Sequence, residues 1–363
     1  MHPFYIILFL EAILSLVFFA GSSSTKAKGK SAAKYRKQIY LLLAFGFLLF
    51  FHAFRDPYSL PDIAEYADAY KESFGYTWKR VLSDQFVSLK CEVGFRLIIK
   101  GVSSIFSSYQ MLFVLTSIFL IYSFYQATKR YSAFFFISVM VFMVNSFADS
   151  LFMLRSFLAI SILLFSFPYI MERKIVPSLL LNILAMSIHI SSVIFLPVYF
   201  LYGIKKSKWI WVLFIIVGGI LLFNFYDIVS YIVERYLPGY SYYFVYLDNY
   251  EGASWKMPAL LGFLLLMRVV VLRRNFFDMG ITRLLSILSV LAFLVYTAGM
   301  GFGLTSRMAM FFTNMTFLVL SDTISHMKNK PLGILISFMY IIFNSYFFLR
   351  NSSDSLWINY RLI

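Results

Sequence analysis

The chain has 363 residues, of which 61% are hydrophobic and 13% are charged, and its mean hydropathy is +0.78. This composition lies far outside that of soluble proteins and predicts an all-α, polytopic membrane protein with a single integral membrane domain over residues 1–363. Cys91 is the only cysteine, which excludes an intramolecular disulfide and a zinc cluster.

The formal net charge is +15, and the excess basic residues are concentrated in particular loops between the apolar segments. Basic residues beside membrane spans remain preferentially in the cytoplasm, so the charge predicts orientation in the bilayer and does not indicate nucleic acid as a partner. The loops assigned to the cytoplasm are the basic stretches near residues 26–37, 129–130, 173–174, 205–208, 273–283 and 328–330.

The first apolar segment, residues 4–19, lacks a basic leader and precedes its basic run, which predicts a permanent span with the N-terminus outside. A second span over residues 39–54 opens a first outer, periplasmic loop of residues 55–92 that is rich in carboxylates. After this loop, helical spacing predicts an interfacial helix whose apolar face holds Phe95, Ile98, Ile99, Val102 and Phe106.

Three further spans are predicted over residues 109–127, 132–147 and 156–171. The turn between the first two of these is basic and faces the cytoplasm. The short turn before the last one faces outward, so it brings Asp149 and Arg155 to the mouth of that span.

Residues 176–202 are almost wholly apolar, yet they carry His189 near their middle and basic residues at both ends. Both ends are therefore expected on the cytoplasmic side, and two helical arms of about 13 residues would reach about 20 Å each. We interpret the segment as a short hairpin with its tip at His189. One long tilted span is the alternative, and it would reverse every later loop.

A span over residues 209–225 leads to a second outer loop, residues 225–257, that is dense in tyrosine and includes Tyr242 and Tyr243. Tyrosines gather at membrane interfaces, but their flat faces and hydroxyls also suit sugar rings, so this loop is either an interfacial belt or a glycan platform. Four last spans bring the total to roughly twelve, with the C-terminus outside; they cover residues 258–272, 284–300, 308–325 and 332–349.

Six ionisable residues are predicted at or near the outer ends of different spans, namely Arg55, Asp62, Glu92, Arg155, His189 and Arg307. A single arginine there is commonly a snorkelling end residue, and an intramembrane histidine can simply bond a neighbouring helix. Together, guanidinium groups suit a lipid-linked diphosphate, and a histidine or carboxylate suits a base for a sugar hydroxyl.

Tyr66 follows Asp62 by four residues, which places both on one face if the segment after Pro61 is helical. The alternative is that this face is simply a solvated helix face. The sequence contains no Asp-x-Asp spacing that would bridge a metal to a nucleotide sugar, and it lacks the usual nucleotide, serine-hydrolase and zinc-protease motifs. No metal site and no cofactor are therefore expected.

Four stretches in order resemble the EpsG family, which is related to Wzy-type polysaccharide polymerases. They are RDPYSLPDIAEYADAY with Asp62 and Tyr66, CEVGFRLI with Glu92, LRSFLAISI with Arg155, and LAMSIHISSVIFLP with His189. The resemblance is clear over residues 55–197 and rests elsewhere on hydropathy and the Arg307 turn. The residue after Arg155 is Ser156, where the family often has glutamine, so the detail of that site departs from the pattern.

The resemblance implies a bacterial inner-membrane enzyme with a GT-C-like cavity open to the outside. It would move a growing exopolysaccharide, capsule or O-antigen chain from undecaprenyl diphosphate to a new lipid-linked repeat, without a metal. Arg155 and Arg307, with Arg55 as a third residue, would hold the diphosphate. In the catalytic set, His189 would be the base, Asp62 is the rival for that role, and Glu92 would position the reacting groups. Tyr66, Tyr242 and Tyr243 would contact glycan, and a chain-length regulator would be a partner.

Two other functions fit the same features. A flippase or transporter for the lipid-linked glycan would also need a basic cavity, although it would show paired repeats and charges in both leaflets. A membrane acyltransferase that modifies polysaccharide could likewise use a histidine with arginines.

Overall fold

A computed structural model describes residues 3–20, 29–60, 62–204, 207–236, 255–278, 280–298, 303–352 and 361–362. The structure is 84% helical, and the described residues form no strand beyond one isolated bridge between Arg55 and Leu362. The chain divides into two compact units. The first unit comprises Met1–Phe165, Ile183–Ile190 and Lys328–Ile363, and the second comprises Ser166–Asn182 and Ser191–Met327.

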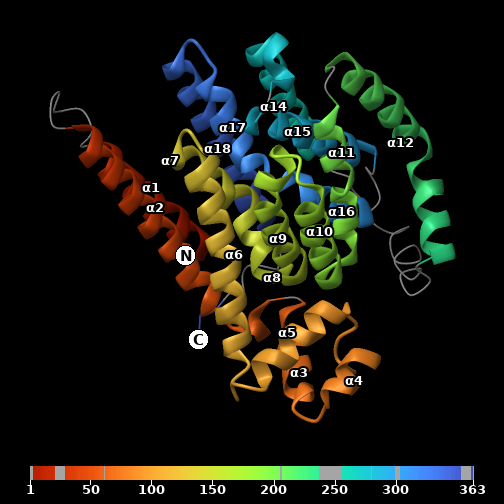
Figure 1. Cartoon of the computed structure of the whole chain (residues 1–363). Coiled ribbons are helices and arrows are strands. Elements are labelled where there is room, and N and C mark those ends of the chain that lie inside the picture. The colour runs from red at the N-terminus through yellow and green to blue at the C-terminus, as the bar shows by residue number, and fades with distance from the viewer. Residues whose placement is uncertain are drawn as a thin grey trace. The chain divides into compact units, whose positions relative to one another are not determined.

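The first unit is built on long apolar helices (Figure 1). Helix α2 packs along α6, and buried aromatic side chains such as Phe45, Phe124 and Phe142 fill the space between them and α7. These side chains have no polar group to satisfy, so they form a core that needs no water. The bounds are α1 (Pro3–Ala20), α2 (Gly29–Ala53), α6 (Gln110–Tyr131), α7 (Phe135–Phe142), η2 (Met143–Phe147), α8 (Ala148–Phe152) and α18 (Lys330–Ser352).

The stretch predicted as the first outer loop folds into short helices, η1 (Pro57–Ser59), α3 (Ile63–Ser73) and α4 (Trp78–Ser83). Helix α5 (Val93–Ser103) follows, as its apolar spacing predicts, and contacts both α3 and α4 (Figure 1). The Glu72 carboxylate accepts the backbone N–H groups of Val87 and Ser88, at 2.8 and 2.9 Å, which ties the loop after α4 to α3. The loop is thus a packed helical group beside the start of α6.

The predicted hairpin is visible as two helical arms, α10 (Ile175–Ile188) and α11 (Pro197–Gly203), joined by a 3-10 turn, η3 (Ile190–Phe195). The base of the first arm contacts the second arm: the Tyr199 hydroxyl donates to the Arg173 carbonyl at 2.9 Å, and the guanidinium lies 4.1 Å from the centre of the Tyr199 ring. Since the two ends of the segment meet, the chain folds back on itself, as the hairpin interpretation predicts.

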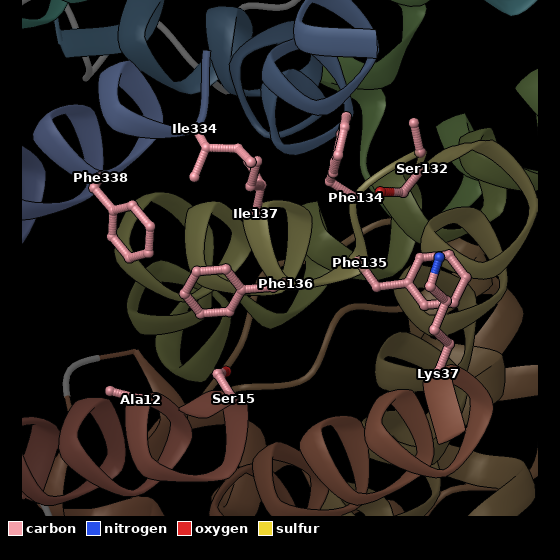
Figure 2. Close-up of a pocket in the computed structure, with 11 residues that line it drawn as sticks. Ala12, Ser15, Lys37, Ser132, Phe134, Phe135, Phe136, Ile137, Ile334 and Phe338 are labelled. Carbon is pink, nitrogen blue, oxygen red and sulfur yellow. The ribbon is translucent and has the colours of Figure 1, made fainter. Parts of the chain in front are cut away.

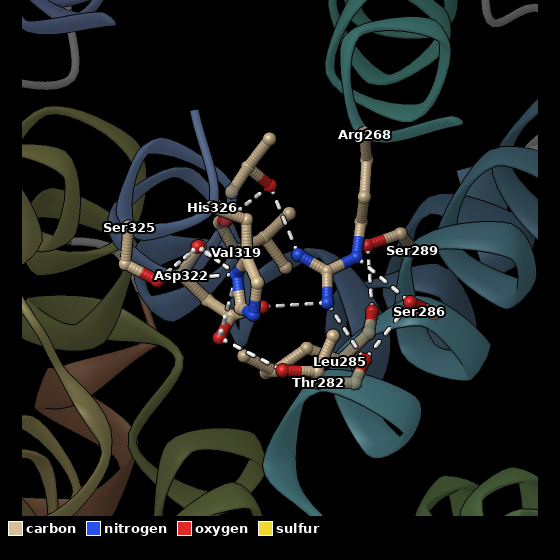
Figure 3. Close-up of polar contacts among 10 residues, drawn as sticks. Arg268, Thr282, Leu285, Ser286, Ser289, Val319, Asp322, Ser325 and His326 are labelled. Atoms are coloured by element: carbon tan, nitrogen blue, oxygen red, sulfur yellow. Dashed lines mark hydrogen bonds and ion pairs between the residues drawn. The ribbon is translucent and has the colours of Figure 1, made fainter. Parts of the chain in front are cut away.

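The second unit gathers around α15, which contacts α12, α14, α16 and α17. Its helices are α12 (Ser207–Tyr236), α14 (Lys256–Leu272), η5 (Arg273–Phe277), α15 (Ile281–Ala298), α16 (Gly303–Thr313) and α17 (Thr316–Ser325). A buried ion pair joins two of these helices, because Arg268 of α14 donates to the Asp322 carboxylate of α17 at 2.7 Å (Figure 3). Three more guanidinium N–H groups donate to the Ser286 hydroxyl, the Thr323 hydroxyl and the Thr282 carbonyl, so Arg268 links α14 to α15 and α17.

Some helix ends differ from those predicted. Helix α12 bends at Asn224 and continues to Tyr236, into the start of the predicted tyrosine-rich loop. The residues between Asn224 and Pro238 include no proline or glycine, so nothing in that stretch breaks the helix. The predicted span at 308–325 is divided near Asn314 and Met315 into α16 and α17. The turn predicted before Arg155 narrows to a single break at Met153, since α8 extends to Phe152 and α9 (Leu154–Met171) begins directly after it.

Four helical segments among the described residues are long and apolar enough to cross a membrane, and they are Gln110–Tyr131, Phe135–Phe152, Leu154–Met171 and Ile281–Ala298. Several shorter apolar helices accompany them, at Ile6–Ser15, Ile175–Ile188, Ile190–Gly203 and Trp209–Leu221. The protein is therefore an integral membrane protein with several apolar helices. The total of twelve spans and the GT-C-like cavity stay predictions.

Candidate functional site

One carboxylate of the first unit links three segments that are distant in sequence. Glu92 precedes α5, and its Oε2 accepts from Arg155 Nη1 of α9 at 2.9 Å. Its Oε1 accepts the backbone N–H of Ile190 at 2.9 Å and lies 3.5 Å from His189 Nδ1. The tip of the hairpin, the start of α9 and the start of α5 therefore meet at Glu92. We call Glu92, Arg155, His189 and Tyr66 the Glu92 cluster.

A glycine lets α5 approach the hairpin tip. At Gly94, one residue into α5, an added Cβ would lie only 2.6 Å from the Ser187 carbonyl oxygen and 2.8 Å from its carbonyl carbon. Backbone atoms cannot turn away as a side-chain end can, so any larger residue would push the tip off α5. Gly94 thus sets the close approach that brings the Ile190 N–H within reach of Glu92.

Tyr66 completes the cluster from α3. Its ring is buried and packs edge-on against Phe95 at 5.3 Å, and the guanidinium carbon of Arg155 lies 6.0 Å from the ring centre. Arg155 Nη1 also lies 3.5 Å from the Lys90 carbonyl oxygen. The side chains of Arg155, Glu92 and His189 are 20%, 12% and 14% exposed, so the cluster is shielded yet reachable from solvent.

The electrostatics keep Glu92 ionised. Burial alone would raise the pKa of its carboxyl, but the His189 imidazole, the Arg155 charge and the Ile190 N–H outweigh burial and hold the pKa at about 2. The neighbouring thiol responds in the opposite direction, since burial raises the pKa of Cys91 to about 12. Glu92 is therefore an anion at neutral pH that positions its partners, whereas Cys91 is a poor nucleophile.

Asp62 lies at the exposed N-terminal end of α3, with a left-handed φ of 60° and no capping bond from its side chain. A residue other than glycine is rare in this region of backbone space, and such strain gathers at functional positions. Glu65, one turn later, responds to both neighbours: burial and the Asp62 charge raise its pKa, while the Arg155 charge lowers it. Asp62 and Glu65 thus bring negative charge to the edge of the Glu92 cluster.

Arg55 has a different environment in the first unit. It is fully buried, its Nη1 donates to the carbonyl of His52 and lies 2.8 Å from His52 Nδ1, and its guanidinium carbon lies 5.1 Å from the ring centre of Phe113. These contacts give Arg55 a place in the packing of α2 against α6. Its role in diphosphate binding stays a prediction.

The remaining predicted residues lie elsewhere. Arg307 belongs to α16 of the second unit, so its grouping with Arg155 stays a prediction. Tyr242 and Tyr243 lie outside the described residues. Sequence reasoning missed Glu65 and Gly94. The i, i+3 spacing from Asp62 could have indicated Glu65, whereas nothing local marks Gly94 as a contact with the hairpin.

Comparison with known proteins identifies a family. The model of the EpsG family matches residues 38–362, which is nearly the whole chain and includes every residue of the Glu92 cluster. No curated protein and no solved structure matches the chain.

Proposed function

Because the chain belongs to the EpsG family, a family of Wzy-like polysaccharide polymerases, we propose that it lengthens a surface polysaccharide by glycosyl transfer at the outer face of the bacterial inner membrane. The donor would be the growing glycan on undecaprenyl diphosphate, and the acceptor a lipid-linked repeat unit. The observation that carries this proposal is the Glu92 carboxylate, which brings a guanidinium and an imidazole to one place at the hairpin tip.

In the reaction, a hydroxyl oxygen of the acceptor sugar bonds to the anomeric carbon of the donor glycan. The bond between that carbon and the diphosphate oxygen breaks, and undecaprenyl diphosphate leaves with the electron pair. The hydroxyl proton passes to a base. The chemistry thus needs positive charge beside the diphosphate and a base beside the hydroxyl.

Arg155 suits the diphosphate. One of its N–H groups is engaged by Glu92, and its Nε is buried without a hydrogen-bond partner among the described residues. A buried guanidinium N–H without a partner is costly, and an anionic oxygen would satisfy it. Arg307 and Arg55 are the further candidates for this role. No metal ion is needed in this scheme, and the described residues hold no group of three potential metal ligands.

His189 suits the base. An imidazole that gives its Nδ1–H to a carboxylate accepts a proton at Nε2, and the carboxylate stabilises the imidazolium that forms. Glu92 lies on the Nδ1 side and stays ionised, so it would fix this orientation. Asp62 is the rival base, because it is exposed and adjoins the cluster. Tyr66 would contact glycan, and Tyr242 and Tyr243 are candidates for the same role from the second outer loop.

The proposal is tested by Arg155→Ala and His189→Ala in cells that depend on this protein for polymer. Loss of a preorganised charge or a base commonly lowers a rate by on the order of 10² to 10⁴, so each variant should leave single repeats while still inserting into the membrane. Arg80→Ala is the matched control, since this exposed arginine lies on α4 and pairs with Asp84 at 3.5 Å. Polymer of normal length in either variant would remove that residue from the mechanism.

A further inference from the structure

A cavity of about 720 Å³ lies in the first unit between α1, α2, α7 and α18 (Figure 2). Its volume falls within the ~300–1,000 Å³ of typical ligand sites. The lining is mainly aromatic and aliphatic and includes none of the residues of the Glu92 cluster. It is formed by Ala12, Ser15, Lys37, Ser132, Ala133, Phe134, Phe135, Phe136, Ile137, Ile334 and Phe338.

The cavity has a polar end and an apolar end. Figure 2 shows Lys37 and Ser132 at one end, and Ala12 and Phe338 at the other, with Phe136 between them. Lys37 is the one charged side chain in the lining, and its amine forms no ion pair or hydrogen bond with other described residues. A ligand that fits this cavity would therefore carry one anionic group and a long apolar part.

The polar end coincides with one predicted face of the membrane. Lys37 is the last charged residue before the apolar part of α2, and Ser132 follows the basic pair Lys129 and Arg130. Each of these basic positions is predicted to be cytoplasmic. This prediction places the polar end of the cavity at the cytoplasmic headgroup level and its apolar end in the acyl region.

We propose that this cavity binds an anionic phospholipid of the cytoplasmic leaflet. One acyl chain occupies the space between Phe136, Phe338 and Ala12, and the phosphate pairs with the Lys37 ammonium. A basic residue near an anionic leaflet contributes about 1 kcal/mol of attraction, which corresponds to about fivefold in affinity. This proposal depends on the membrane placement of the helices and not on the polymerase activity.

Native mass spectrometry of the full-length protein in detergent tests the proposal, with phosphatidylglycerol and phosphatidylcholine of identical acyl chains as probes. Wild-type protein should retain one phosphatidylglycerol about fivefold more tightly than phosphatidylcholine. Lys37→Gln should lose this preference. Lys328→Gln, which removes an exposed lysine outside the cavity, should keep it. Ala12→Trp should weaken retention of both lipids, because the indole fills the acyl space.

Three results would overturn the proposal. One is an unchanged preference in Lys37→Gln, and another is undiminished retention of both lipids in Ala12→Trp. The third is displacement of phosphatidylglycerol by equimolar undecaprenyl phosphate, which would make the carrier lipid the occupant. Elongation activity is measured on the same samples. Since Lys37 and Ala12 lie outside the Glu92 cluster, a failure of lipid binding with normal elongation would leave the proposed function intact.

Discussion

At the scale of single residues, Glu92 determines the geometry of the candidate site. It accepts hydrogen bonds from Arg155 and from the Ile190 backbone, so its carboxylate both balances a guanidinium and anchors the hairpin tip. An uncharged amide could keep the shape of the side chain but would lose the charge-assisted bonds, which contribute more than neutral ones.

We therefore predict that Glu92→Gln lowers the stability of the protein at pH 7 by about 2 kcal/mol. The pKa of Glu92 is held at about 2, below its ordinary value of 4.5, so the stabilisation is fully present above pH 4.5 and is lost as the pH falls toward 2. Thermal unfolding in detergent at pH 7 and pH 3, monitored by tryptophan fluorescence, checks this. The difference between wild type and variant should narrow at pH 3. An equal difference at both pH values would show that Glu92 is not stabilised as an anion.

Ionisable residues within or beside apolar segments could be recognised from the sequence as candidate site residues. His189 and Arg155 are ionisable groups within or beside apolar segments, and Glu92 opens one, so hydropathy alone marks them. Glu65 was not predictable in this way, because it is one of several carboxylates in a polar loop and only the fold of α3 brings it near Arg155. The burial of Arg55 could not be predicted from the sequence either. It lies among His52, Ser117 and Phe113 because of how α2 packs against α6.

At the scale of elements, the hairpin is the feature that sequence predicts best. Basic residues at both ends and a length unsuited to one upright span indicated it, and Tyr199 does return to Arg173. Its docking was not predictable, because the close approach of α5 to the tip depends on contacts that are distant in sequence. The same holds for the break between α16 and α17, where the side chain of Asn314 bonds the Met310 carbonyl inside an apolar run.

The docking of the hairpin predicts a contrast between two glycines of α5. Gly94→Ala should lower elongation at least tenfold, because the new methyl group would collide with the Ser187 backbone and separate Ile190 from Glu92. Gly101→Ala is the control, since no atom lies within 4 Å of a Cβ there and alanine is the better helix former by about 1 kcal/mol. Equal elongation rates for the two variants, measured at equal protein levels, would show that the close approach at Gly94 is not needed.

The buried ion pair between Arg268 and Asp322 predicts different stabilities for a single and a double variant (Figure 3). Arg268→Met leaves the Asp322 carboxylate buried without its cation and should destabilise the protein by about 3–5 kcal/mol. The double variant Arg268→Met/Asp322→Leu removes both charges and should recover much of that loss, as judged by thermal unfolding. If the double variant is no more stable than Arg268→Met, the ion pair is not the reason for the loss.

At the scale of the whole molecule, the membrane class and helical fold were predictable from composition, and the family follows from the match over residues 38–362. The number of spans was harder to predict, because several apolar helices are short or interrupted and hydropathy does not separate a hairpin arm from a span. The charge distribution nevertheless predicts which loops face the cytoplasm.

This orientation predicts a labelling pattern. In a Cys91→Ser background, Val87→Cys in the first outer loop should react with an impermeant maleimide in cells whose outer membrane alone is permeable, since Val87 is 89% exposed. Lys328→Cys should react only after the inner membrane is also opened. Reversal of the two patterns would invert the topology and place the Glu92 cluster on the cytoplasmic side.

Elongation by the purified protein shows whether this protein itself forms glycosidic bonds at the Glu92 cluster, as we propose. A flippase or transporter has no membrane to move a substrate across in detergent. An acyltransferase has no acyl donor when only lipid-linked repeats are supplied without a thioester. Wild-type protein should convert undecaprenyl-diphosphate-linked repeats into longer chains with release of undecaprenyl diphosphate, also in the presence of a metal chelator. Arg155→Ala and His189→Ala should release none. Failure of the pure, folded wild-type protein to lengthen any lipid-linked repeat, or undiminished elongation by both variants, would contradict the account.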